Sequence, residues 1–107
     1  MYKPPVMSLT DFAAAREDPR LLVLDTRLPE ERLTLPLINP FNTVAYAPRA
    51  SVGQDLMRLA LLLSGRHVVV VDLSEEAAVA VARALQSADV HAMALERGLD
   101  GWRDAMQ

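Results

Sequence analysis

The 107-residue sequence predicts a single α/β domain: a small parallel sheet of about five strands with helices on both faces. Three observations lead to this prediction. The length suits one domain and is too short for two ordinary ones. Hydrophobic residues make up 51% of the chain, which is enough for a packed core. Short apolar runs alternate with segments of helical periodicity, a pattern typical of parallel sheets covered on both faces.

The first elements are bounded by clear local signals. Residues 5–7 are expected to form a short edge strand, and Ser8 is expected to cap a helix that follows it. This helix should run to about residue 17, where Asp18-Pro19 ends it, because the residue before a proline avoids helical geometry. The run LLVLD, residues 21–25, is continuously apolar and predicts a central strand.

The middle of the chain is less regular. Pro29 favours a short helix over residues 29–32, and two prolines make residues 33–40 irregular. Residues 43–46 predict a short strand. A single helix is expected over residues 51–63, ending near Gly65, because glycine suits the left-handed residue that follows a helix.

The last elements complete the alternation. Residues 67–72 form an apolar run that predicts a second central strand, and an alanine-rich helix is expected over residues 75–87. Residues 90–95 predict the last buried strand. A closing helix over residues 98–106 carries Leu99, Trp102 and Met106 on one face, so we expect these side chains to join the core.

Composition excludes several classes of function. The chain has no cysteine, which rules out disulfides, thiolate metal ligands and a cysteine nucleophile. The net charge is −3 without a basic run, so nucleic acid is not an expected partner. No apolar stretch suggests a signal peptide or a membrane span. We expect a soluble, cytoplasmic protein without a cofactor or a metal site.

The turn after residue 71 carries unusual charge for its position. In α/β proteins a turn between a buried strand and a helix often holds a nucleophile or a phosphate. Here the turn offers Asp72, Ser74, Glu75 and Glu76. Ser74 is expected to cap the helix, and two acids in its first turn complement the helix dipole. The sequence therefore indicates that this turn supplies its own negative charge and does not need an external anion.

Three segments resemble those of single-domain rhodanese-like proteins, over roughly residues 6–107. We therefore expect residues 1–107 to form a single domain of this kind. In LLVLDTRLPEER, Asp25 and Arg27 match an Asp-x-Arg that follows an apolar strand. In ALERGLDGW, Gly98 and Trp102 match a Gly-Gly-x-x-x-Trp element, with Arg97 in place of the first glycine. VVVVDLSEEAAVAVARAL stands where the family has a strand, the catalytic loop and a helix. We therefore expect structural positions, or positions at the rim of the sheet where the buried strands end, for Asp25, Arg27, Arg97, Gly98 and Trp102.

The resemblance implies sulfur transfer through a cysteine, but the sequence departs from the family at that position. The catalytic cysteine falls at Asp72, and the loop after it reads Leu73, Ser74, Glu75, Glu76 and Ala77. A Gly-His-Ile-Pro-Gly-Ala segment is replaced by residues 35–40, with Asn42 matching the asparagine that follows. A carboxylate cannot carry a persulfide. Its charge about 4 Å from an anionic donor would also cost about 4 kcal/mol at an effective dielectric near 20. Because of these departures, none of the family's sulfur-transfer residues carries over to this sequence.

The two aspartates at the ends of buried strands suggest a metal or phosphate site, but a structural role explains them more simply. Asp25 and Asp72 could hold Mg²⁺ or accept phosphate, but Asp25 is expected to brace its own loop through Arg27. An ion pair of Asp72 with Arg27 or Arg97 is the preferred structural expectation. His67 and His91 lie in or beside strands without spaced partner ligands, which favours a packing role for both.

The segment DLMRLALLLSG is more apolar than a helix on one side of a sheet requires. Either residues 33–40 cover it, or it faces a second copy or another protein through Leu56, Arg58, Leu61 and Leu62. The main hypothesis is a catalytically inactive rhodanese-like domain that acts as a protein-binding or regulatory module. The alternatives are an acidic-rim enzyme or phosphoacceptor that uses Asp25 and Asp72 with Mg²⁺, and a sulfurtransferase completed by a partner's cysteine.

Overall fold

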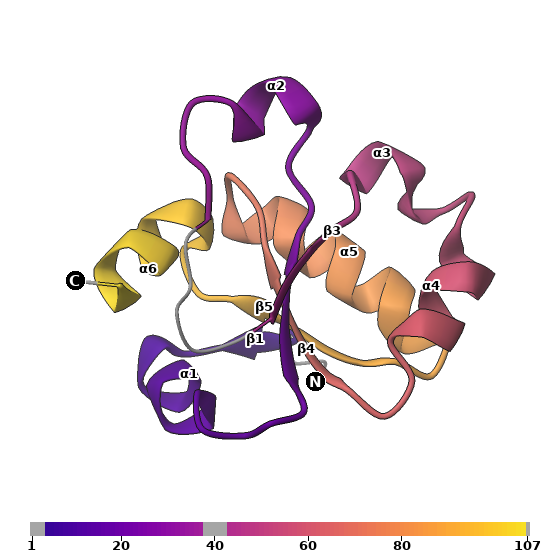
Figure 1. The fold of residues 1–107 in the computed structure, drawn as a ribbon, viewed down its shortest axis with the longest axis horizontal. Helices are drawn as coiled ribbons and strands as arrows, with labels where there is room; N and C mark the ends of the chain where they lie inside the picture. Colours follow the sequence, from indigo (N-terminus) through magenta and orange to yellow (C-terminus); the bar gives the residue numbers. More distant parts are fainter. Residues whose placement is uncertain (1–3, 38–42, 107) are drawn as a thin grey trace.

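The structure is a computed structural model that describes residues 4–37 and 43–106. Five strands form one parallel sheet in the order β1-β5-β4-β2-β3 (Figure 1). This confirms the predicted fold class. The strands are β1 Val6–Met7, β2 Leu21–Asp25, β3 Thr43–Tyr46, β4 His67–Val71 and β5 His91–Leu95.

The described residues also form six helices. They are α1 Leu9–Ala15, α2 Pro29–Arg32, α3 Arg49–Val52, α4 Leu56–Leu62, α5 Glu75–Ser87 and α6 Gly98–Ala105. The single helix predicted over residues 51–63 is wrong, because the chain turns at residues 53–55 and forms α3 and α4. Glycine is a poor helix former, and Gly53 lies at the end of α3, where this break occurs.

The two faces of the sheet have separate apolar cores. On one face, alternate residues of β2 and β4 such as Leu24 and Val70 pack against α3, α4 and α5. On the other face, Val69 packs with Phe12 of α1 and Trp102 of α6. The Phe12 and Trp102 rings lie 5.9 Å apart between centroids. Trp102 is therefore a core residue, as the periodicity of its helix predicts.

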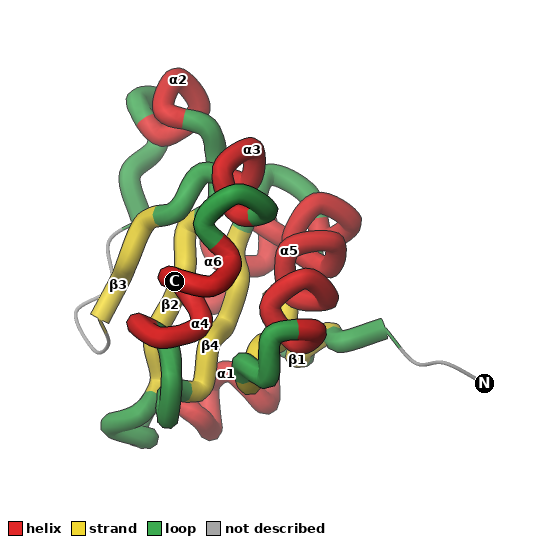
Figure 2. Tube along the Cα trace, turned by 90° about the vertical axis from the view of Figure 1, so that its right-hand side faces the viewer, coloured by secondary structure: helices red, strands yellow, loops and turns green. Residues whose placement is uncertain are grey.

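The register of the central strands creates the candidate site. Leu21 pairs with His67 and Asp25 pairs with Val71, so the chain leaves β2 and β4 at the same level. Residues 25–27 and residue 72 consequently lie next to each other at the carboxyl edge of the sheet. Figure 2 shows α2 and α3 at this end of the strands.

The described helices are short, and the longest of them, α5, has 13 residues. Within residues 4–37 and 43–106, no helix has the length and apolar character needed to cross a membrane. Asn42 and the last part of segment 33–40 lie outside the described residues.

Candidate functional site

Asp72 is the centre of the site, and its carboxylate is fully enclosed. The residue follows β4 directly and is 0% exposed. Arg49 Nη1 donates to Asp72 Oδ1 over 2.7 Å, and the Leu73 N–H donates to the same oxygen over 2.7 Å. The Thr26 hydroxyl donates to Asp72 Oδ2 over 2.8 Å. A buried carboxylate needs such donors, because transfer of an unpaired charge out of water is very costly.

The cation that neutralises Asp72 is not one of the two predicted from the sequence. The expected ion pair with Arg27 or Arg97 is wrong, since Arg49 of α3 takes this role. Arg27 is bound to Asp25, and Arg97 Nη1 lies 2.7 Å from Asp104 Oδ2 on the surface. The fold explains the difference, because the backbone places the start of α3 beside the end of β2.

Thr26 joins the three segments that meet at the site. Its N–H donates to the Val71 carbonyl over 3.1 Å, and its own carbonyl accepts from the Arg49 N–H over 2.9 Å. Its hydroxyl bonds Asp72. One residue thus fixes the end of β4 and the start of α3 at once. Thr26 is not among the residues predicted for the site, and its only signal in the sequence is its place inside the Asp-x-Arg element.

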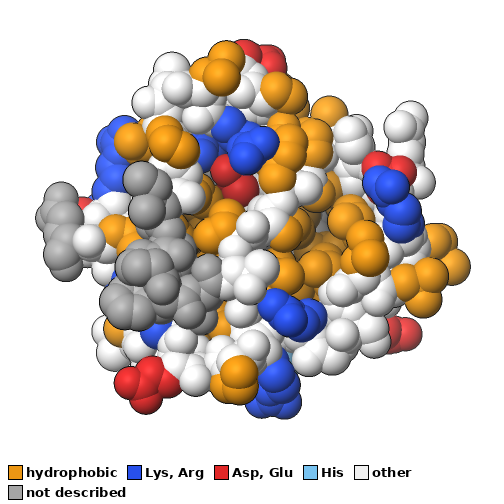
Figure 3. All heavy atoms as spheres, viewed as in Figure 1, with side chains coloured by type: hydrophobic (Ala, Val, Ile, Leu, Met, Phe, Trp, Pro, Cys, Tyr) orange, Lys and Arg blue, Asp and Glu red, His pale blue; other side chains and the backbone are white. Residues whose placement is uncertain are grey.

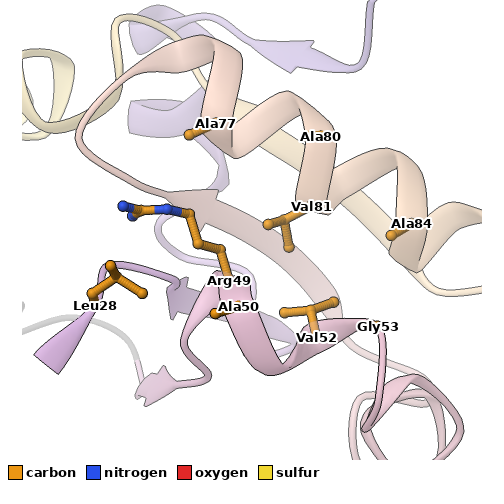
Figure 4. Close-up of a pocket in the computed structure, with 9 residues that line it drawn as sticks. All are labelled: Leu28, Arg49, Ala50, Val52, Gly53, Ala77, Ala80, Val81 and Ala84. Carbon is orange, nitrogen blue, oxygen red and sulfur yellow. The ribbon is translucent and has the colours of Figure 1, made fainter.

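Arg49 also connects the buried carboxylate to α2. Its guanidinium donates to both oxygens of Glu31, over 2.8 and 3.0 Å, and Glu31 Oε1 accepts from the Leu28 N–H over 2.7 Å. Hydrogen bonding by Arg49, and then by Leu28, lowers the pKa of Glu31. The bond with Glu31 is the largest of the effects that raise the pKa of Arg49. Figure 4 shows the Arg49 side chain reaching from α3 along the end of a groove.

A second ion pair lies beside the first one. Arg27 Nε and Nη2 donate to the two oxygens of Asp25 over 3.1 and 3.0 Å, and the Arg27 N–H also donates to Asp25. The structure therefore bears out the expectation that Asp25 braces its loop through Arg27. Arg32 lies 3.5 Å from Asp25 and stacks over the ring of Tyr46. Asp25 is thus paired with Arg27 and Arg32, whereas Asp72 is paired with Arg49.

The β4–α5 turn uses its acidic and polar residues for its own structure. Ser74 caps α5 by accepting from the Ala77 N–H, as predicted. Glu75 accepts from the Arg97 N–H over 2.9 Å and so holds the start of α6. Gly98 has a φ of +58° and packs against the backbone of residues 72–75, where a Cβ would lie 2.8 Å from the Asp72 carbonyl oxygen.

This arrangement limits what the site can do chemically. The carboxylates of Asp25, Glu31 and Asp72 are balanced by three guanidinium groups, so Asp72 does not present the bare charge expected to repel an anionic substrate. The donors around Asp72 are instead occupied by its own carboxylate. In the described part of the chain, no three histidine, aspartate or glutamate side chains are grouped to hold a metal ion.

An apolar surface adjoins the site. A groove of about 440 Å³ lies between α3 and α5 and begins at Arg49 and Leu28 (Figure 4). Its walls consist mainly of small side chains, including Ala50, Ala77 and Ala80. In Figure 3, apolar side chains gather on the right-hand side of the molecule, over α3, α4 and α5.

The residues of α4 contribute unequally to this surface. Leu61 is 80% exposed, Leu62 and Met57 are also largely exposed, and Arg58 is exposed. Leu56 instead packs against the core. The described part of segment 33–40 does not shield Leu61 or Leu62, and its Leu37 packs against the core on the opposite face of the sheet. The expectation that this segment covers the helix therefore fails for residues 33–37.

Comparison with known proteins bears on the fold. Neither protein-family models nor curated proteins gave a match to the sequence. A rhodanese-related protein from Thermoplasma volcanium superimposes with a TM-score of 0.71 at 15% identity, over 92% of this chain and 89% of that one. The human single-domain sulfurtransferase TSTD1 gives 0.71 at 16% identity, over 95% and 97%. The Saccharomyces cerevisiae single-domain sulfurtransferase RDL2 gives 0.66 at 13% identity, over 97% and 92%.

These similarities establish a rhodanese-like fold, which agrees with the resemblance in the sequence. The similar structures include single-domain sulfurtransferases, whereas this chain contains no cysteine.

Proposed function

We propose that this chain is a catalytically inactive rhodanese-like domain that acts by binding protein, as a partner module or a regulatory subunit. The observation that carries the proposal is the enclosed Asp72–Arg49 pair at the β4–α5 turn. A turn of this kind stabilises an anion through N–H groups and nearby cations. In this chain the Leu73 N–H, Thr26 and Arg49 bind the carboxylate of Asp72.

The chemistry of sulfur transfer supports the same conclusion. A rhodanese-type reaction needs a thiolate that attacks the sulfur donor and then holds the sulfur as a persulfide. The chain has no thiol, and a carboxylate paired with arginine is a poor nucleophile. The fold is thus retained without the group that would react.

The exposed side of α4 supports a binding role. Large apolar side chains at Met57, Leu61 and Leu62 of α4 are largely exposed. Contiguous exposed apolar surface of this kind marks sites of protein interaction. We assign the binding surface to α4, with Leu61 and Leu62 as its centre and Arg58 at its polar edge.

The catalytic half of the proposal is tested by thiocyanate formation from thiosulfate and cyanide. We expect the purified chain to give the rate of buffer alone. Turnover that disappears in Asp72→Asn would overturn the proposal, because it would assign a reaction to this site.

The binding half is tested by affinity capture with matched variants. Proteins retained by the native chain should be lost with Leu61→Ser and kept with Leu33→Ser, which changes an exposed leucine at the end of α2. Equal capture by all three forms would contradict the assignment to α4.

A further inference from the structure

The two histidines of the chain lie side by side at the amino ends of their strands, whereas Asp72 lies beyond the carboxyl end of β4. His67 is the first residue of β4 and His91 is the first residue of β5, and the two are partners in the register of these strands. Paired residues of parallel strands project to the same face of the sheet. The two rings lie 4.3 Å apart between centroids. Their spacing in the sequence gives no sign of this proximity, which only the pairing of β4 with β5 creates.

A carboxylate holds one of these rings in place. His67 Nδ1 lies 3.1 Å from Asp18 Oδ2, and the Arg20 N–H donates to Asp18 Oδ1 over 2.9 Å. The hydrogen bond from the Arg20 backbone is the main cause that lowers the pKa of Asp18. A histidine that donates its Nδ1–H to a carboxylate keeps a free lone pair on Nε2.

We propose that His67 and His91 form a binding site for a divalent transition metal ion such as Zn²⁺. His67 Nε2 and one nitrogen of His91 supply the two protein ligands, and water completes the coordination. Asp18 acts as a positioning residue, because it fixes the tautomer and orientation of the His67 ring without touching the ion.

The geometry is close to what such a site requires. With metal–nitrogen bonds of about 2.1 Å and a nitrogen–metal–nitrogen angle near 90–110°, two imidazole centroids lie about 4.6 to 5.3 Å apart. The observed separation of 4.3 Å is within about an ångström of this range, so the two rings lie near enough to bind one ion. The His67 side chain is 32% exposed and His91 is exposed, so an ion with its waters can reach both.

The ligand chemistry also selects the class of ion. Neutral imidazole binds zinc, nickel and copper, whereas Mg²⁺ and Ca²⁺ prefer oxygen ligands. Because the chain has two histidines and no cysteine, metal binding that depends on imidazole can arise only from this pair.

Isothermal titration calorimetry with Zn²⁺ on the untagged full chain tests the proposal. We expect saturable binding of one ion per chain, and no binding of Mg²⁺. His91→Ala should weaken Zn²⁺ binding at least tenfold, and Asp18→Asn should weaken it about tenfold or more through loss of ring orientation. Glu17→Gln removes the same charge from the adjacent residue and should leave the affinity unchanged.

Two results would overturn the site. One is the absence of saturable Zn²⁺ binding to the native chain, and the other is unchanged affinity in His91→Ala. Because His91 is exposed, this variant should keep the native thermal unfolding curve without metal, which separates loss of a ligand from loss of the fold. In the native chain, Zn²⁺ should raise the melting temperature, and His91→Ala should abolish that rise.

Discussion

At the scale of single residues, Thr26 shows how a small side chain can determine the geometry of a charged site. Its backbone bonds the end of β4 and the start of α3, while its hydroxyl bonds the Asp72 carboxylate over 2.8 Å. Hydrogen bonds to a charged group contribute more to stability than those between neutral groups. The position of Arg49 against Asp72 therefore depends on a residue without charge.

Substitution of Thr26 separates the hydroxyl from the shape of the side chain. Thr26→Val keeps the shape and removes the donor, so the free energy of unfolding should fall by about 2 to 3 kcal/mol. Thr26→Ser keeps the hydroxyl and loses one methyl group, which should cost about 1 kcal/mol. Urea unfolding of both variants measures the two losses in free energy, and Thr26→Val should show the larger one. The reverse order would mean that the hydrogen bond to Asp72 contributes little.

The sequence predicted one ion pair of the site and missed the other. Asp25 and Arg27 are two residues apart, so the loop between them could be expected to close locally. Asp72 and Arg49 are separated by 23 residues, and only the placement of α3 against β2 brings them together. Thr26 carried no separate signal, because its role depends on hydrogen bonds that exist only after the sheet has formed.

At the scale of elements, α2 is tied to the site through Glu31. This four-residue helix has no buried residue of its own, so apolar packing holds it weakly. The hydrogen bonds of Glu31 with Arg49 and Leu28 replace that packing. The position of α2 over the rim should therefore depend on the charge of one carboxylate.

Acid should release this contact. Because the folded-state pKa of Glu31 is lowered, its contribution to stability is complete above the ordinary glutamate pKa and is lost as the pH falls through the lowered value. The free energy of unfolding should thus decrease below about pH 5, and less steeply in Glu31→Gln. Glu30→Gln, at the adjacent exposed position, should follow the native curve. Identical pH profiles for the native chain and Glu31→Gln would contradict this.

The junction between α6 and the β4–α5 turn depends on Gly98. Its φ of +58° disfavours other residues, and a Cβ would lie 2.8 Å from backbone atoms of Asp72 and Ser74. Gly98→Ala should lower the free energy of unfolding by more than about 2 kcal/mol. Gly65→Ala is a matched control, since its φ is +76° but nothing lies within 4 Å, and it should cost about 1 kcal/mol. Thermal unfolding of both variants measures the difference, and equal costs would show that the close contact is unimportant.

Most elements followed from the sequence because each rests on a local pattern. Continuous apolar runs predicted β2 and β4, and Ser74 predicted the start of α5. The break between α3 and α4 was missed. The single helix expected over residues 51–63 treats Gly53 as an ordinary helical position, although Gly53 lies at the end of the four-residue helix α3.

At the scale of the whole molecule, the sheet separates three surfaces. The carboxyl edge holds the closed Asp72 site, the opposite edge holds the two histidines, and α4 exposes an apolar side next to the groove. The sequence indicated that α4 is more apolar than its packing requires, but not whether the extra apolar side chains are covered or exposed. Coverage depends on the course of residues 33–37, and Leu37 packs on the other side of the sheet.

Substitution of two leucines of α4 should change the stability of the fold by very different amounts. Leu61 is 80% exposed, so Leu61→Ser should change the free energy of unfolding by less than about 0.5 kcal/mol. Leu59 is 9% exposed within the core, so Leu59→Ala should cost about 2 to 4 kcal/mol. Denaturant unfolding measures both values. A large loss in Leu61→Ser would mean that this side chain stabilises the fold rather than serving a partner.

The central claim is that the carboxylate of Asp72 fills the place where an external anion would bind. Titration of thiosulfate into ¹⁵N-labelled protein tests this most directly, through the amide resonances of residues 73–77. Our account predicts no saturable shift of these resonances. Saturating shifts on the amides after Asp72 would show that an anion enters the turn, and would contradict it.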